Sequence, residues 1–380
     1  MNEAISKMLA CYGCRKAADD PRAMREILQG VVLLGLWRGR FFERAALCGG
    51  AALRLLYGLD RFEADLDFTL LSPTPGFVFN RYRDAVVREV QSLGFYIYMT
   101  KKTIHRASPL ESAFLKTDTL QYALEITAIP ETTWRRYTPN PPIRLRIEID
   151  TNPPSGATVE SRTCMLPIPF SVRTLAPPEL LAMKLAALLT HRYYRQPKGR
   201  DWYDLSWCAA HQPKLNLAHL EARLRQTGWM PPKERPAGDG KQPGTEAQRL
   251  SGEGELLTDG ETQSDGETHS DRESNSTGEG ETAVSKGGVL TGAEVLKMAE
   301  KVIKLLDIEE ARREVLPYLS APGTAGTEAC ATAAWSPEFF REAVCRIVMG
   351  DVPPAADCGE RAGRLASSGA FHPRVAAYAL

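Results

Sequence analysis

The sequence has no apolar run long enough to cross a membrane, although 43% of its 380 residues are hydrophobic. A helix that spans a bilayer needs about 20 consecutive apolar residues. The first residues also lack the basic segment and apolar stretch that are typical of a signal peptide. We therefore expect a cytoplasmic protein with no membrane partner.

Closely spaced cysteines are also scarce. The chain has eight cysteines, but only Cys11 and Cys14 form a close pair, and no second pair follows at the spacing of a zinc ribbon. Scattered cysteines in a long chain suit a reducing compartment better than a disulfide framework. We interpret Cys11 and Cys14 as ordinary residues.

The chain has no net charge, because 47 basic side chains balance 47 acidic ones. The balance conceals an acidic stretch at 246–282, which holds 11 acidic and two basic residues. The rest of the chain then carries 45 basic and 36 acidic side chains. A basic body favours polyanionic partners such as RNA, although solubility alone would also explain it.

Composition divides the chain into several parts. Residues 231–288 are rich in Gly, Ser, Thr, Glu and Pro and cannot bury enough apolar surface to order themselves, which predicts a disordered acidic insertion. The other predicted parts are an N-terminal helical layer (1–40), a core of strands and helices (41–170), the two parts of a helical domain (171–230 and 289–350) and a loose tail (351–380).

The chemistry is expected in one short segment of the core. A strand over Ala45–Cys48 leads into Gly49 and Gly50, at the start of a helix that ends at Gly58. The free N–H groups and the dipole of a helix N-terminus favour phosphate. The next strand carries Asp65 and Asp67, which point to the same face because strand side chains alternate. Two adjacent carboxylates are tolerable where solvent or a hard cation such as Mg²⁺ neutralises them. Together the two features favour nucleoside triphosphate chemistry.

A third carboxylate is available on a later strand. Ile143–Asp150 alternates strictly, so that Glu148 and Asp150 share the polar face. We select Glu148 as the third metal ligand because it lies in the middle of the strand, whereas Asp150 lies at its end. An exposed charged face with arginine partners explains the same pattern equally well.

Two further residues are notable in the helical domain. Lys184 lies in an otherwise apolar helix, where it needs an anionic partner or ligand unless its stem carries the charge out to solvent. Asp201 and Asp204 share a face near the start of the next helix. Helix capping would explain one of them.

With these motifs placed, the chain resembles the AbiEii/AbiGii toxin family of nucleotidyltransferase-like proteins. The matching segments, which cover roughly residues 30–225, appear in the family's order: Gly49-Gly50-Ala51-Ala52-Leu53 with Tyr57-Gly58-Leu59, Asp65-Leu66-Asp67-Phe68, Lys184-Leu185-Ala186-Ala187-Leu188 with Arg192, and Arg200-Asp201-Trp202-Tyr203-Asp204-Leu205. The turn reads Gly-Gly-Ala where many relatives have Gly-Gly-Thr or Gly-Ser, and the acidic insertion is not part of the family pattern.

The resemblance implies an α+β fold: a DNA polymerase β-like nucleotidyltransferase core, with a mixed sheet flanked by helices, followed by a helical C-terminal domain. It implies that Gly49 and Gly50 contact the triphosphate, that Asp65 and Asp67 bind Mg²⁺, that Lys184 binds the nucleotide's phosphates, and that Asp201 is a catalytic or site-organising acid. It also implies an NTP substrate, an acceptor that is the 3′ end of tRNA in some relatives, and a cognate antitoxin.

Three hypotheses follow. The chain is an active nucleotidyltransferase toxin, a nucleotide- or partner-binding protein of the same fold without turnover, or an enzyme of that fold that modifies a small molecule. A neighbouring antitoxin-like gene would favour the first. Loss of toxicity in Asp67→Ala, with partner binding kept, would separate the first from the second.

Overall fold

The computed structural model describes residues 3–12, 21–102, 119–128, 142–190, 198–211, 214–227, 289–319 and 332–350. All of these residues belong to one compact unit, which the chain before residue 232 and the chain after residue 288 form together. The acidic insertion at 231–288 and the tail at 351–380 lie outside the described residues and stay predictions, as do the domain boundaries.

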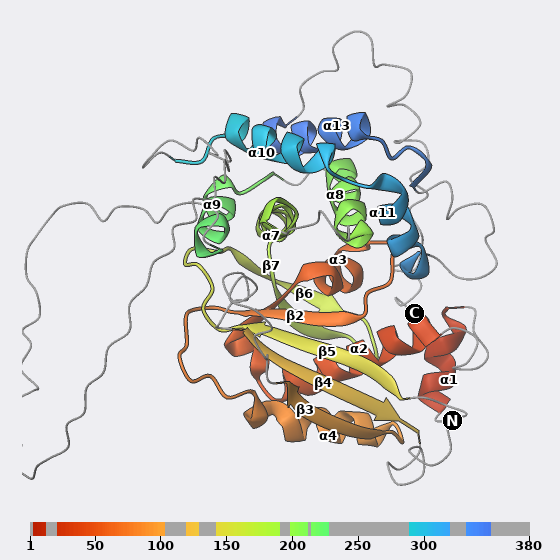
Figure 1. The fold of residues 1–380 in the computed structure, drawn as a ribbon. Helices are drawn as coiled ribbons and strands as arrows, with labels where there is room; N and C mark the ends of the chain where they lie inside the picture. Colours follow the sequence, from red (N-terminus) through yellow and green to blue (C-terminus); the bar gives the residue numbers. More distant parts are fainter. Residues whose placement is uncertain are drawn as a thin grey trace, which may run out of the picture. The chain divides into compact units, whose positions relative to one another are not determined.

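The described strands form one mixed sheet in the order β3-β4-β5-β2-β1-β7-β6 (Figure 1). The central strand β2 is antiparallel to β1 and parallel to β5, while β1 is parallel to β7. The other three pairs are antiparallel. The strands are β1 (Ala45–Cys48), β2 (Asp65–Leu70), β3 (Tyr96–Lys102), β4 (Thr119–Thr127), β5 (Ile143–Asp150), β6 (Val159–Cys164) and β7 (Phe170–Leu175).

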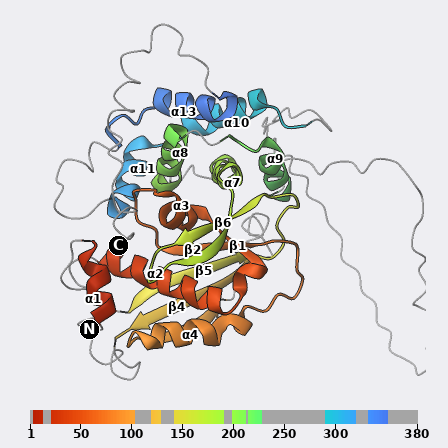
Figure 2. The same cartoon turned by 180° about the vertical axis from the view of Figure 1, so that it is seen from behind.

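Alternation along the strands gives the sheet two different faces. On β2, the buried Leu66 and Phe68 alternate with Asp65 and Asp67. Phe68 packs against Phe41 at 4.9 Å between ring centroids, on the face that α2 (Pro21–Arg38) and α4 (Arg83–Ser92) cover (Figure 2). The short helix α3 (Gly49–Tyr57) lies against β1 and β2 on the opposite face, the side of the two aspartates. The apolar face therefore holds the core, and the acidic face remains available for a site.

A glycine brings α2 and α4 together. A Cβ built on Gly35 would lie 2.6 Å from Cα of Val86 on α4, closer than any real side chain can approach backbone. The two helices thus pack backbone against backbone at this point. Helix α2 begins at Pro21, a residue that suits the first turn of a helix, and a short helix α1 (Glu3–Ala10) precedes it.

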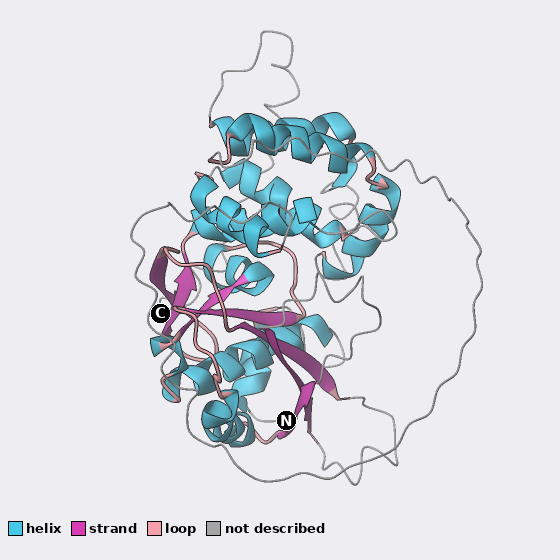
Figure 3. Ribbon diagram, turned by 60° about the vertical axis from the view of Figure 1, so that its left-hand side comes forward, coloured by secondary structure: helices cyan, strands magenta, loops and turns pink. Residues whose placement is uncertain are grey.

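Helices from both sides of the insertion form a layer next to α3 (Figures 1 and 3). They are α7 (Pro177–Thr190), α8 (Gly199–His211), α9 (Leu217–Gln226), α10 (Gly292–Lys304), α11 (Ile308–Val315) and α13 (Pro337–Met349), while η1 (Phe41–Glu43), η2 (Phe79–Tyr82) and η3 (Leu316–Tyr318) are short 3₁₀ turns. The contact of Trp202 on α8 with Phe340 on α13, at 4.6 Å between centroids, joins the two chain segments.

This arrangement confirms the predicted α+β fold, a mixed sheet flanked by helices and followed by a helical region. Among the described residues no helix combines the length and apolar character that a membrane span requires. Cys11 is exposed and forms no disulfide, and Cys14 lies outside the described residues.

Candidate active site

The strand register brings the predicted carboxylates together. Asp67 on β2 pairs with Glu148 on β5 and with Cys48 at the end of β1. Asp65 pairs with Arg146. Because directly paired residues project to the same face, Asp65, Asp67, Glu148 and Arg146 form one group, which we call the carboxylate cluster.

Glu148 is better placed than Asp150 to join this group. Asp150 is buried and forms an ion pair with Arg223 on α9, so its carboxylate ties β5 to the helical region. Glu148 is 30% exposed and accepts a hydrogen bond from Gln121 at 3.2 Å. Glu148 also lies 3.2 Å from Arg146, as the alternative interpretation of a charged face with arginine partners expects. The carboxylate group and the arginine partner are thus both present on this strand.

The Gly49–Gly50 turn fits tightly against the acidic strand. Gly49 has φ +69°, and a Cβ there would lie 2.4 Å from Oδ2 of Asp67. A Cβ on Gly50 would lie 2.0 Å from Oε2 of Glu63. The positive φ of Gly49 favours glycine there, and a side chain at Gly50 would force the Glu63 carboxylate to move. Cys48 precedes the helix and its side chain caps no N–H group, which leaves the helix start to interact with a ligand.

Arg146 occupies the centre of the carboxylate cluster. Its guanidinium donates to Asp65 and lies 3.2 Å from a carboxylate oxygen of Glu148. Within the described ranges, no three Asp, Glu, His or Cys side chains are arranged to hold a metal ion. The donor atoms are nevertheless the hard oxygens that Mg²⁺ prefers. Asp65, Asp67 and Glu148 are the residues that would hold such an ion, and Arg146, which is 44% exposed, contacts two of them.

The cluster leaves Asp67 poorly neutralised. Burial, followed by the charges of Glu148, Glu63 and Asp65, raises the pKa of Asp67 to about 8, and the more distant Lys184 offsets only part of this. A buried carboxyl beside other carboxylates ionises at neutral pH only when an added cation compensates its negative charge. The excess negative charge of these carboxylates therefore suits a divalent cation.

Lys184 and Asp201 meet on the other side of the Gly49–Gly50 turn. Nζ of Lys184 lies 3.0 Å from Asp201 and 2.7 Å from Asp204, and its side chain is 12% exposed. Of the two alternatives for Lys184, the structure shows the paired one. Burial alone would lower the pKa of Lys184, but the charges of Asp204 and Asp201 have the larger effect. The net pKa is raised, so the ammonium keeps its charge. The pKa of Asp201 is well below its ordinary value: burial opposes ionisation, but the charge of Lys184 outweighs it.

Sequence reasoning missed the residues that connect these two groups. Arg61 is fully buried and binds both carboxylate oxygens of Asp204, at 2.6 and 2.7 Å, and Glu63 at 2.9 Å. Arg200 bridges Glu63 at 3.2 Å and Glu314 at 3.1 Å. We call this set the ion-pair network; its members are Arg61, Glu63, Lys184, Arg200, Asp201, Asp204 and Glu314.

One signal in the sequence could have revealed Glu63. It precedes Asp65 by two positions, so it continues the same alternation of acids along the chain. Arg61 had no such signal, because its partner Asp204 lies 143 residues away. Arg192, which belongs to the resemblance, lies outside the described residues.

A mixed sheet with paired carboxylates on its central strand, beside a Gly-Gly helix start, is the arrangement expected of a nucleotidyltransferase core. Residues 31–272 match the model of the family described as nucleotidyl transferase AbiEii toxin of type IV toxin–antitoxin systems. The chain belongs to this family.

Two solved structures are similar to parts of the chain. One is a candidate nucleotidyltransferase from H. pylori, with 19% identity over 55% of this chain and 77% of that one and a TM-score of 0.34. The other is JHP933 from Helicobacter pylori, with 20% identity over 54% and 73% and a TM-score of 0.31. No curated protein matches the chain.

Proposed function

We propose that the chain is an Mg²⁺-dependent nucleotidyltransferase that moves a nucleoside monophosphate from an NTP to an acceptor, with the 3′ end of tRNA as the acceptor to test first. The observation that carries this proposal is the close contact of Asp67 with the Gly49–Gly50 helix start, so that the proposed phosphate site and the proposed metal site would adjoin. The family's place in type IV toxin–antitoxin systems supports a toxic role in the cytoplasm and a cognate antitoxin partner.

Each group in the site would have a separate task. Backbone N–H groups at Gly49 and Gly50 would bind oxygens of the triphosphate. Asp65, Asp67 and Glu148 would hold Mg²⁺, which when bound polarises the acceptor hydroxyl and the departing pyrophosphate. Lys184 would face the phosphates, and Asp201 would hold its ammonium in place through the 3.0 Å ion pair.

The transfer itself exchanges one phosphorus–oxygen bond for another. The acceptor oxygen bonds to the α-phosphorus, and the bond from that phosphorus to the bridging oxygen of pyrophosphate breaks. The hydroxyl proton passes to the carboxylate cluster, and the pyrophosphate leaves with the displaced electron pair. Because little covalent chemistry is asked of the protein, positioning and charge stabilisation supply most of the rate.

One observation favours a second candidate, a nucleotide- or partner-binding protein without turnover. Arg146 already neutralises part of the carboxylate cluster through its contacts with Asp65 and Glu148. If this arginine stays in place, a nucleotide could bind at the Gly49–Gly50 turn without the metal that transfer needs. A small-molecule acceptor on the same site is the remaining alternative.

A transfer assay separates these functions. Purified protein is incubated with each α-³²P-labelled NTP, Mg²⁺ and total tRNA, beside an Asp65→Ala/Asp67→Ala variant. The proposal expects label on RNA with the wild type only, and the productive NTP identifies the nucleotide preference. Unlabelled RNA from a protein that still binds NTP would contradict transfer to tRNA and support the second candidate.

A further inference from the structure

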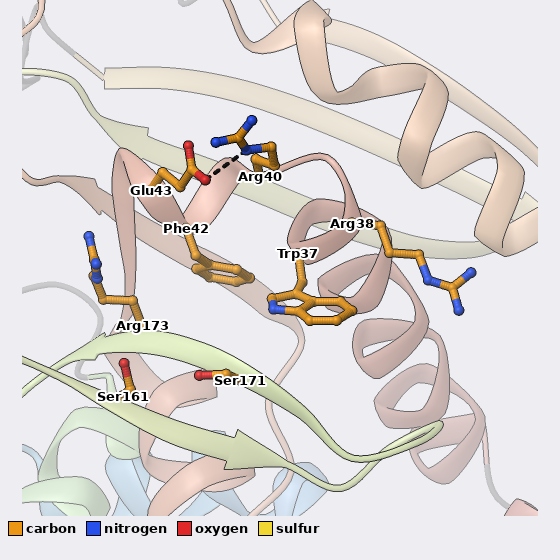
Figure 4. Close-up of a pocket in the computed structure, with 8 residues that line it drawn as sticks. All are labelled: Trp37, Arg38, Arg40, Phe42, Glu43, Ser161, Ser171 and Arg173. Carbon is orange, nitrogen blue, oxygen red and sulfur yellow. Dashed lines mark hydrogen bonds and ion pairs between the residues drawn. The ribbon is translucent and has the colours of Figure 1, made fainter.

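A recess lies at the end of β1 remote from the Gly49–Gly50 turn, between the end of α2, the η1 turn and the β6–β7 hairpin (Figure 4). Its volume is about 520 Å³, within the range of small-molecule sites. The lining residues are Trp37, Arg38, Arg40, Phe42, Glu43, Ser161, Ser171 and Arg173. Phe42 precedes β1 and Gly49 follows it, so the strand separates this recess from the candidate active site.

The chain geometry that creates the recess is a left-handed turn at Arg40. Arg40 has φ 63°, which is uncommon outside glycine, and its guanidinium pairs with Glu43 at 2.7 Å. The turn redirects the chain from α2 into η1, so that Trp37 and Phe42 lie side by side above the hairpin (Figure 4).

The recess combines one exposed indole ring with hydroxyl groups, and the largely buried ring of Phe42, which is 7% exposed, lies beside it. Trp37 is 42% exposed, a large fraction for this side chain, although its ring also contacts Phe170 at 5.9 Å. Ser161 on β6 and Ser171 on β7 lie on the hairpin below the two rings (Figure 4). An exposed indole face that adjoins hydrogen-bonding groups suits a planar heterocycle, which stacks on the ring and offers polar edges.

The charge in the recess suits an anion. Arg40 pairs with Glu43, and Arg38 points away and pairs with Glu89 at 2.5 Å (Figure 4). Arg173, by contrast, forms no ion pair with any described residue, although it lies beside Ser161 in the hairpin register. An arginine without a carboxylate partner at the edge of a stacking surface is available for a phosphate.

We propose that this recess binds one nucleotide unit, with its base on the exposed ring of Trp37 and its phosphate on Arg173, and that it is a second contact for single-stranded RNA. The assignment to RNA rests on the proposed function, whereas the nucleotide chemistry rests on the recess itself. The same chemistry could come from a free mononucleotide. An acidic peptide would use Arg173 but would leave the aromatic walls and the two hydroxyls without a role, so RNA is favoured.

The test measures binding of a fluorescein-labelled single-stranded RNA of mixed sequence, without NTP and in EDTA, so that it does not depend on transfer. Trp37→Ala and Arg173→Glu should each weaken binding about tenfold.

The matched controls are Tyr96→Ala, an aromatic residue 43% exposed on the opposite edge of the sheet, and Arg83→Glu on α4. The controls should change binding less than twofold. Because Trp37 contacts Phe170, thermal melting accompanies each variant. Arg173→Glu, which breaks no ion pair with a described residue, gives the result if Trp37→Ala unfolds.

The outcomes are distinct. Equal losses in the pocket variants and in their controls would overturn the proposal, as would unchanged RNA affinity together with lost binding of an acidic protein partner. Competition by unlabelled AMP at micromolar concentration would assign the recess to a free mononucleotide, and competition only by oligonucleotides would assign it to RNA. The binding assay contains neither NTP nor free Mg²⁺, so failure of the transfer assay leaves this test intact.

Discussion

The two charged groups on either side of the Gly49–Gly50 turn solve the same electrostatic problem in opposite ways. In the ion-pair network, each acid lies against a cation of the chain, and Arg61 and Asp204 are both fully buried. In the carboxylate cluster, Asp65 and Glu148 share the partly exposed Arg146, and the pKa of Asp67 rises to about 8 because burial and its acidic neighbours disfavour ionisation.

The difference teaches which group is structural and which is prepared for a ligand. A buried pair that is broken leaves an uncompensated charge, so the ion-pair network fastens α7 and α8 to the segment that leads into β2. An acidic group that the chain leaves under-neutralised is instead a place where an external cation gains affinity. In the sequence both groups contain several Asp and Glu residues. What distinguishes them in the structure is how many of these acids lie against a basic side chain.

The largest effect is expected from breaking the ion-pair network at Arg61. Arg61→Met keeps much of the side-chain volume but leaves Asp204 and Glu63 without their shared cation. Removing one partner of a buried pair costs about 3–5 kcal/mol, so the free energy of unfolding should fall by that amount in urea denaturation. Arg162→Met is the control: Arg162 is 47% exposed and pairs with Glu160 at 2.6 Å, and a surface pair contributes about 1 kcal/mol or less. Equal losses in the two variants would show that the network does not fasten the helices.

In the carboxylate cluster we expect a smaller change in the free energy of unfolding, and here the substitution raises it. Asp67 has a folded-state pKa of about 8, above the value of about 4 for an unfolded aspartate. Between these values the folded protein keeps a proton that the unfolded chain has lost, so its free energy of unfolding falls as pH rises, and it levels off above about pH 8. Asp67→Asn removes this penalty.

The measurement is urea unfolding in EDTA at pH 5, 7 and 8.5. The Asn variant should gain little at pH 5 and about 1–3 kcal/mol at pH 8.5, after allowance for partial solvent screening. Asp84→Asn on the exposed side of α4 should show no such trend. A constant difference between Asp67→Asn and wild type at all three pH values would contradict the raised pKa.

Local patterns in the sequence predicted the parts of the site that lie within one strand. Alternation placed Asp65 and Asp67 on one face, and the mid-strand position selected Glu148, which the register sets directly beside Asp67. The helix start at Gly49 was equally local. These features depend on strand and turn geometry, which a few neighbouring residues determine.

Features that depend on distant chain segments could not be predicted in the same way. The pair Arg61–Asp204 spans 143 residues, and no periodicity links its members. The β6–β7 hairpin escaped prediction because β6 is an edge strand whose side chains are mostly exposed, so it lacks the alternation that identifies a half-buried strand. The recess at Trp37 was missed for the same reason, since the hairpin forms one of its walls.

The smallest expected effect tests whether Arg146 stands in for a metal ion. Arg146→Gln removes the cation that Asp65 and Glu148 share, so a divalent ion should bind more tightly because it no longer competes with the guanidinium. Arg146 is 44% exposed, and solvent therefore limits the gain to about three- to tenfold in affinity. Mn²⁺ titration followed by electron paramagnetic resonance measures this directly.

Arg144→Gln is a matched control, because Arg144 lies two residues away on the same face of β5 but pairs with Glu125 at 3.0 Å. Equal affinities in the two variants would show that long-range charge alone acts on the site. Weaker Mn²⁺ binding in Arg146→Gln would show that Arg146 positions the carboxylates for the ion, and the contrast between a self-neutralised network and a metal-ready cluster would then have to be redrawn with Arg146 as part of the site.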